Sequence, residues 1–339
     1  MQVTDFDPSQ ASDAQLSQWR EVLNAMTEAD MPGEPRWQLD QLRDYLSVTM
    51  PGEHRYAFVA RENDAADSRI IGHANLLLLA DDFDDTGVFE IFVHPGARGH
   101  GVGRTLLREV ARRAAVEGRG TIGVEVIATT PAVDFYDRLG FSRAVVENRH
   151  LLAMDRVDWD AVSANAGRVA AGYRLEYHHD GLPDGLLERY AAIKATLKAE
   201  PATNIGAWRG SADVQRLRDS LETLKARGLR SHLVVAINEP TGAVVGLTEL
   251  VVAAQRPTRG DQYDTVVAPE HGSYGLGLAM KARMLTELRE HEPQLRDVQT
   301  WTAIDGDPHA HVDAELGFRN DVQWYEYETV VSDVLYRLN

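Results

Sequence analysis

The sequence predicts an α/β (α+β) protein built from two tandem copies of one domain, and three observations support this. The chain has 339 residues, which is long for a single compact domain. Strand-like and helix-like segments follow one another in the same order in each half. A valine strand end before a glycine-rich turn also recurs, since Val93 and Val267 lie 174 positions apart.

The first half begins with a short strand-like piece at residues 3–6 and an amphipathic helix at residues 11–29. Leu16, Trp19 and Leu23 lie on one face of this helix. The elements that follow are, in chain order, strands at 56–61, 69–79 and 88–93, a helix at 104–117 and a strand at 121–128.

The second half repeats this order. Residues 173–177 alternate as a strand does, and the pattern continues with a helix at 186–197 and strands at 232–238 and 243–253. We therefore expect one domain at residues 1–158 and another at residues 172–339, with a linker of small and polar residues between them.

Composition and charge narrow the classes of function. The chain is 44% apolar and 26% charged, as soluble globular proteins are, and its apolar runs are too short to cross a bilayer. The net charge of −17 disfavours nucleic acid and anionic membranes as partners and would attract cationic small molecules such as amines. With no cysteine and no visible signal peptide, we expect a cytoplasmic protein without a metal cofactor.

The strand at 88–93 runs into a turn rich in glycine. Pro95 ends the strand, and Gly99, Gly101 and Gly103 precede the next helix. Glycines let successive N–H groups at a helix N-terminus wrap a pyrophosphate closely. Such a turn can also be a tight connection. A Rossmann site would follow the first strand and not the fourth, and a Walker A loop would end in Gly-Lys-Ser/Thr, so both of these readings are disfavoured.

Two blocks of the sequence resemble the GNAT acyltransferase superfamily. Residues 93–103 read V-H-P-G-A-R-G-H-G-V-G and match its motif V-x-P-x-x-R-G-x-G-x-G, while residues 131–141 read P-A-V-D-F-Y-D-R-L-G-F and are similar to its P-A-x-x-(L/F)-Y-x-x-L-G-F block. The resemblance implies two tandem GNAT domains, each a mixed, mostly antiparallel sheet flanked by helices. The arrangement is similar to that of mycothiol synthase, but that activity is not assigned, because the division of labour between the halves differs.

The resemblance further implies acetyl-CoA as the co-substrate. Backbone groups of Ile91, Phe92 and Val93 would pair with its pantetheine arm across a splay between the fourth and fifth strands. Arg98 belongs to the motif, and Thr129 stands where the family often has an asparagine that contacts CoA. The amides expected to hold the pyrophosphate are those of Gly99, His100, Gly101, Val102, Gly103 and Arg104.

Two residues are candidates for acid–base chemistry. Tyr136 matches the family's tyrosine near the CoA sulfur and could protonate the leaving thiolate, or it could simply pack beside Phe135. Glu90 interrupts a buried strand and is the candidate base, with a solvated or arginine-paired position as the alternative. Glu125 is a weaker rival base.

The sequence gives fewer candidates for the residues that bind the acyl acceptor. Glu34 and Trp37 lie between the first two helices, where the family builds its acceptor wall, and loop packing is an equal alternative for both. The second copy has Gly272 and Asp313 where the first has Arg98 and Tyr136. We therefore expect a degenerate, non-catalytic C-terminal domain.

The leading function is an N-acetyltransferase that transfers acetyl from acetyl-CoA to an amine of a small molecule. The amine attacks directly, through a tetrahedral intermediate, and the protein acts as a monomer or homodimer. The alternatives are a non-catalytic acyl-CoA-binding regulatory protein and a protein or peptide N-acetyltransferase.

Overall fold

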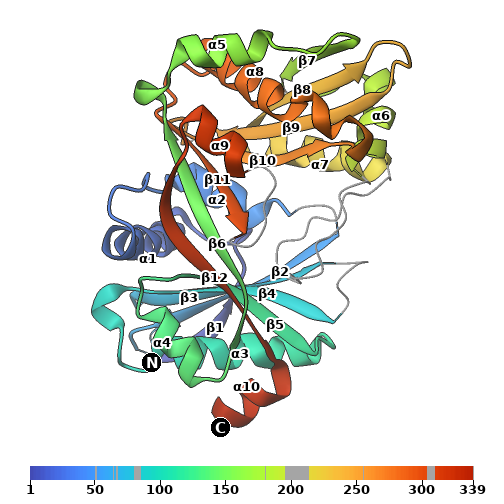
Figure 1. The fold of residues 1–339 in the computed structure, drawn as a ribbon. Helices are drawn as coiled ribbons and strands as arrows, with labels where there is room; N and C mark the ends of the chain where they lie inside the picture. Colours follow the sequence, from blue (N-terminus) through green and yellow to red (C-terminus); the bar gives the residue numbers. More distant parts are fainter. Residues whose placement is uncertain are drawn as a thin grey trace. The chain divides into compact units, whose positions relative to one another are not determined.

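A computed structural model describes most of the chain (Figure 1). The described residues are 1–49, 52–63, 65, 68–79, 85–179, 181–194, 214–254, 256–303 and 310–338. Among them, no helix is both long and apolar enough to cross a membrane. The chain divides into two compact units. The described parts of unit 1 are residues 1–147 and 323–338, and those of unit 2 are residues 148–194 and 214–322.

Unit 1 is organised around a mixed sheet. Its strands lie in the order β1-β2-β3-β4-β5-β12-β6. The pair β4–β5 is parallel, whereas β1–β2, β2–β3, β3–β4 and β5–β12 are antiparallel. The strand bounds are β1 Gln2–Phe6, β2 Glu53–Arg61, β3 Ile70–Leu79, β4 Thr86–Val93, β5 Thr121–Ile127, β6 Ser142–Ala153 and β12 Arg319–Val330.

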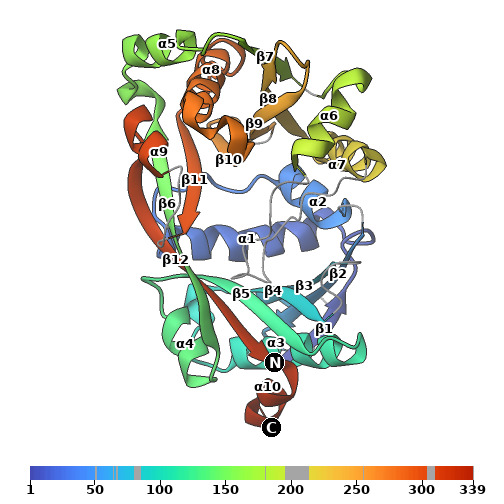
Figure 2. The same cartoon turned by 45° about the vertical axis from the view of Figure 1, so that its right-hand side comes forward.

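Helices cover both faces of this sheet (Figure 2). On one face, α1 (Asp13–Asp30) and α2 (Leu39–Ser47) bury Trp19 and Leu42 against β2 and β3. On the other face, α3 (Val102–Val116), α4 (Ala132–Arg138) and α10 (Val331–Leu338) close a second core around Phe89 and Leu106. Helix α1 begins with a capping box, in which Ser12 and Gln15 satisfy each other's backbone N–H groups.

Unit 2 repeats the plan. Its strands follow the order β6-β11-β10-β9-β8-β7, with a parallel pair β10–β11 and antiparallel pairs β7–β8, β8–β9 and β9–β10. Its elements are η2 Met154–Arg156, α5 Trp159–Gly167, β7 Tyr173–His179, α6 Asp184–Lys194, α7 Val214–Ala226, β8 Leu229–Asn238, β9 Val244–Ala253, β10 Arg259–Val267, η3 Pro269–Tyr274, α8 Leu276–His291, β11 Asp297–Ala303 and α9 Ala310–Leu316. The two-copy α/β fold with mixed, mostly antiparallel pairing is thus confirmed.

The units do not follow the expected boundaries at 158 and 172. The stretch expected as a linker contains helix α5, whose Val162 is buried in the core of unit 2. The last segment of the chain belongs to unit 1, because β12 pairs with β5 from Trp324 opposite Ile127 to Val330 opposite Thr121. The C-terminal segment thus belongs to the unit with which its strand pairs, although it follows the whole of unit 2 in the sequence. The predicted end of the helix at residue 197 lies outside the described residues.

The place of α10 in unit 1 is testable by substitution. Val334 is 0% exposed and packs in the core around α3, whereas Tyr336 on the same helix is 85% exposed. We expect Val334→Ala to lower the free energy of unfolding by about 2 kcal/mol. Hydrogen exchange should speed up in α3 and β5 and stay unchanged in α8. Tyr336→Ala is the matched control, and loss of protection in α8 instead would contradict this placement.

Candidate active site

Strands β4 and β5 separate at the centre of unit 1. They pair only from Thr86 opposite Thr121 to Val88 opposite Gly123. Beyond this point β4 stays paired with β3 as far as Val93, and β5 stays paired with β12 as far as Ile127. The edge of β4 from Phe89 onward therefore has no strand beside it on the β5 side among the described residues. An extended ligand could pair with backbone groups there, as predicted for Ile91, Phe92 and Val93.

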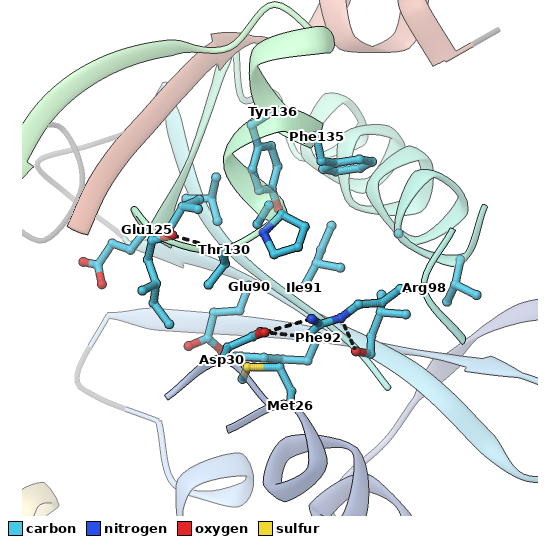
Figure 3. A pocket seen from close by; sticks show the side chains of 18 of the residues that line it. Met26, Asp30, Glu90, Ile91, Phe92, Arg98, Glu125, Thr130, Phe135 and Tyr136 are labelled. Atoms are coloured by element: carbon cyan, nitrogen blue, oxygen red, sulfur yellow. Dashed lines mark hydrogen bonds and ion pairs between the residues drawn. The ribbon is translucent and has the colours of Figure 1, made fainter. Parts of the chain in front are cut away.

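A pocket of about 900 Å³ opens at this separation (Figure 3). Residues of α1, β4, the glycine turn, β5 and α4 line it, together with Trp324 of β12. Most of the predicted site residues are among them, namely Trp37, Glu90, Ile91, Phe92, Val93, Arg98, Gly99, Gly101, Val102, Gly103, Arg104 and Tyr136.

The glycine turn ends in an uncapped helix. Gly99 and Gly101 have φ values of +77° and +83°, which residues with a side chain rarely adopt. Gly101 is the N-cap of α3 and supplies no side chain to cap it. In the described part of the chain, no acceptor is bonded to the backbone N–H groups from Gly99 to Arg104. These groups lie at the positive end of α3, so the turn is suited to bind an anion.

Arg98 fixes this turn to α1. Its guanidinium forms two hydrogen bonds with Asp30, of 2.8 Å from Nη1 to Oδ1 and 2.6 Å from Nη2 to Oδ2. Its Nε also donates to the carbonyl of Val93 at 3.4 Å. In this bidentate pair the two terminal nitrogens of the guanidinium are bonded to a carboxylate of the protein itself. The side chain of Arg98 therefore positions the turn, and the N–H groups of the turn are left for a ligand.

Tyr136 lies on α4 and lines the pocket (Figure 3). Its ring contacts Phe135 and Phe141, each with a ring-centroid distance of 5.0 Å, so the packing alternative also describes its surroundings. Only 4% of the residue is exposed, and burial raises the pKa of its hydroxyl well above its ordinary value. The hydroxyl therefore keeps its proton at neutral pH, as a proton donor must.

Glu90 is held in place by two neutral donors. Its Oε2 accepts hydrogen bonds of 2.9 Å from the hydroxyl of Tyr45 and of 2.9 Å from Nδ2 of Asn75. The Arg55 guanidinium lies over the Tyr45 ring, 4.2 Å from its centroid. Glu90 is half-buried and lines the pocket, so these two hydrogen bonds orient its carboxylate within the site.

Glu125 is the neighbouring acid on β5. Its side chain is exposed and lines the pocket, and two further carboxylates lie near it. Loss of hydration, and then the charges of Glu147 and Glu90, raise its pKa to about 7. It therefore exchanges its proton in the neutral range.

Three of the predicted site residues do not line the pocket. Glu34, His100 and Thr129 are absent from its wall, and the turn after β5 exposes Thr129 while its neighbour Thr130 faces the pocket. Thr130 itself donates to the carbonyl of Ile127 at 2.9 Å. Thr129 was predicted to make the CoA contact that an asparagine makes in the family, but its exposed side chain lies outside the pocket wall.

Several lining residues were not predicted. Met26 and Asp30 come from the face of α1 that points to the sheet, which the amphipathic pattern of that helix could have indicated. Trp324 belongs to the last strand, so only the pairing of β12 with β5 reveals its place.

Unit 2 fills the corresponding positions with internal ion pairs. Asp313, which stands where Tyr136 stands in the first copy, is buried and lies 2.5 Å from Nζ of Lys281. Asp264 precedes Val267 by three residues, as Glu90 precedes Val93. The ammonium of Lys194 lies 2.9 Å from Asp264 and 2.6 Å from Glu249. An internal ammonium thus already neutralises each of these acids.

One group in unit 2 has the composition of a metal site. Ligand atoms of His179, His232 and Glu292 lie within 4.8 Å of one another. However, Arg230 engages both carboxylate oxygens of Glu292, and His232 bonds Tyr177 at 2.8 Å and Glu292 at 3.1 Å. These contacts already use the donor atoms that a metal would need.

Known proteins resemble the chain in sequence and in fold. Residues 53–143 match the Acetyltransferase (GNAT) domain family. No curated protein matches the chain. Among solved structures, a tandem GNAT protein from the clavulanic acid biosynthesis pathway is 23% identical with a TM-score of 0.82, over 97% of this chain and 98% of that one.

Two further structures share the fold at lower identity. A GCN5-related N-acetyltransferase from Sphaerobacter thermophilus is 15% identical, with a TM-score of 0.68, over 97% of this chain and 95% of that one. A glucosamine N-acetyltransferase region of a fungal multi-domain protein is 14% identical, with a TM-score of 0.69, over 97% of this chain and 38% of that one. Residues 53–143 thus match the GNAT domain family, and the whole chain has the fold of tandem GNAT proteins.

Proposed function

We propose that the protein is an N-acetyltransferase that transfers the acetyl group of acetyl-CoA to an amine of a small molecule. One observation carries the proposal: the separation of β4 and β5 opens a pocket that also contains the uncapped turn of α3, Glu90 and Tyr136. An anion-binding turn, a free strand edge and a pair of acid–base groups are the parts that a CoA-dependent transfer needs.

The pocket suggests how acetyl-CoA would be held. The N–H groups from Gly99 to Arg104 would bind the pyrophosphate, and the free edge of β4 would pair with the pantetheine amides. An extended arm bound in this way would run back along β4 from the glycine turn and bring the thioester to Glu90. Tyr136 lies on the opposite wall of the pocket (Figure 3).

The chemical step then uses two side chains. Glu90 accepts a proton from the ammonium of the acceptor, and the resulting amine attacks the thioester carbonyl, so that a C–N bond forms. When the tetrahedral intermediate collapses, the C–S bond breaks and Tyr136 donates its proton to the leaving sulfur. The attacking nitrogen, which still carries an extra proton after the C–N bond forms, releases that proton to water, and Tyr136 regains a proton from water. Glu90 then loses the proton that it accepted to solvent. No covalent enzyme intermediate is needed, which is consistent with the absence of cysteine.

We further propose that unit 2 does not catalyse. Its positions equivalent to Tyr136 and Glu90 are Asp313 and Asp264, and Lys281 and Lys194 neutralise them. Lys281 and Asp313 are both buried, so breaking that pair would leave a poorly solvated charge without its partner, which is costly. These acids are therefore not free to move protons for a substrate.

Substitution of the two acid–base groups tests this assignment. We expect Tyr136→Phe and Glu90→Gln each to lower kcat for acetyl transfer by about 100-fold or more, because each removes one proton transfer. Acetyl-CoA consumption across a panel of amines measures the effect. Tyr274→Phe and Glu270→Gln, on the exposed turn of the second copy, are matched controls. Wild-type turnover in both site variants would overturn the roles given to Tyr136 and Glu90.

The tie between Arg98 and α1 makes a separate prediction. Asp30→Asn removes the charged partner of Arg98, so the glycine turn should lose its fixed position. We expect the affinity for CoA to fall about fivefold, with little change in kcat at saturating acetyl-CoA. Isothermal titration calorimetry measures this, and Asp13→Asn, on the exposed start of α1, is the control. Tight CoA binding by the wild type without turnover on any amine would favour a regulatory protein instead.

A further inference from the structure

Four glutamates lie on four adjacent strands of the unit 1 sheet. Glu90 is on β4, Glu125 on β5, Glu326 on β12 and Glu147 on β6, and these strands are neighbours in this order. Glu125 and Glu326 are direct cross-strand partners, so their side chains stand on the same face. Glu125 and Trp324 line the pocket, and Trp324 lies two residues from Glu326 on that face, so Glu326 lies next to the pocket wall.

Three of these carboxylates lie without an ion-pair partner in the part of the chain that the structure describes. Within the described ranges, no lysine, arginine or histidine forms an ion pair with Glu125, Glu147 or Glu326. Like charges opposite each other on a sheet destabilise it. Natural proteins break such rules mainly at functional sites, and a ligand of opposite charge would supply the missing partner here.

Glu326 provides an independent sign of a ligand. It is 4% exposed, and its Oε2 has no hydrogen-bond partner in the part of the chain that the structure describes. Burial, followed by the charges of Glu147, Glu125 and Glu328, raises its pKa to about 8. A buried carboxylate without a donor is costly, and an ammonium or guanidinium group is the donor that would satisfy it.

The spread of the carboxylates indicates an extended cation and not a metal ion. Among the described residues, only His179, His232 and Glu292 bring three possible ligand atoms within 4.8 Å of one another. The glutamates of unit 1 therefore do not surround one point. They form a row that matches cationic groups spaced along a chain.

We propose that the acceptor carries at least two cationic groups: Glu90 faces the amine that is acetylated, and Glu125, Glu326 and Glu147 hold a second ammonium or guanidinium group. This inference rests on the proposed function, since it names the class of substrate for the same pocket. The class is that of diamines and polyamines, and simple monoamines would lack the second contact.

The test compares acceptors that differ only in their number of cationic groups. The probes are propylamine, 1,3-diaminopropane and spermidine, assayed with acetyl-CoA. We expect kcat/KM for the diamine or the triamine to exceed that for propylamine by about tenfold or more. Glu125→Gln and Glu326→Gln should raise KM for these acceptors about tenfold, so that the ratio of kcat/KM for spermidine to kcat/KM for propylamine falls by a similar factor. Glu109→Gln, on the outer face of α3, is the control.

Thermal unfolding gives a second readout that needs no turnover. Spermidine should raise the Tm of the wild type at pH 8.5, and propylamine should not. Because the folded-state pKa values of Glu125 and Glu326 lie above those of the unfolded chain, their ionised forms destabilise the fold at pH 8.5. Glu326→Gln should therefore raise the Tm of the free protein by about 2 °C or more and abolish the shift with spermidine.

The outcomes separate the two proposals. Spermidine binding that depends on Glu125 and Glu326, without acetyl transfer, would refute the proposed function and retain the cation site. Transfer to propylamine as efficient as to spermidine, with wild-type KM in Glu125→Gln, would overturn the cation site and retain the function. Saturable Mg²⁺ binding that is lost in Glu125→Gln, with no effect of spermidine, would also overturn it.

Discussion

The separation of β4 and β5 is the constraint on which the rest of unit 1 depends. A parallel pair that ends at Val88 and Gly123 leaves the edge of β4 unpaired, and β5 can stay ordered beyond that point only because β12 pairs with its other edge. Arg98 then ties the turn after β4 to Asp30 of α1, so one end of the opening has a fixed shape. The pocket is the space that these three contacts hold open.

The two copies keep the same backbone plan and differ in their charges. Both have a parallel strand pair that ends after three residues, and both begin the following helix at a glycine in the left-handed region. In unit 1 the acids at the pocket have neutral donors or no cation, whereas in unit 2 Lys194 and Lys281 neutralise their counterparts. Both copies thus have the same fold, whereas among the described residues the two compared acids of unit 2 each have a lysine partner and those at the pocket of unit 1 do not.

The sequence predicted the order of strands and helices in each unit, but not which unit the last strand joins. Alternation and helical periodicity are local signals, so they identified the strands around Val93 and the amphipathic helix that supplies Leu23 and Met26. The pairing of β12 with β5 is a long-range choice between strands of similar pattern, and nothing near Trp324 in the sequence records its partner. For the same reason Glu125 could be named as a possible base, but the carboxylates opposite and beside it could not. The orientation of Thr129 depended on the geometry of one turn, which the motif match did not specify.

The central proposal is that unit 1 binds acetyl-CoA at its glycine turn. A crystal structure of the protein soaked with CoA tests this most directly. We expect density for the pyrophosphate at the N–H groups from Gly99 to Arg104 and for the pantetheine arm beside Phe89 to Val93 of β4. A CoA molecule bound at Gly275 and β10, with the turn of α3 empty, would contradict the account.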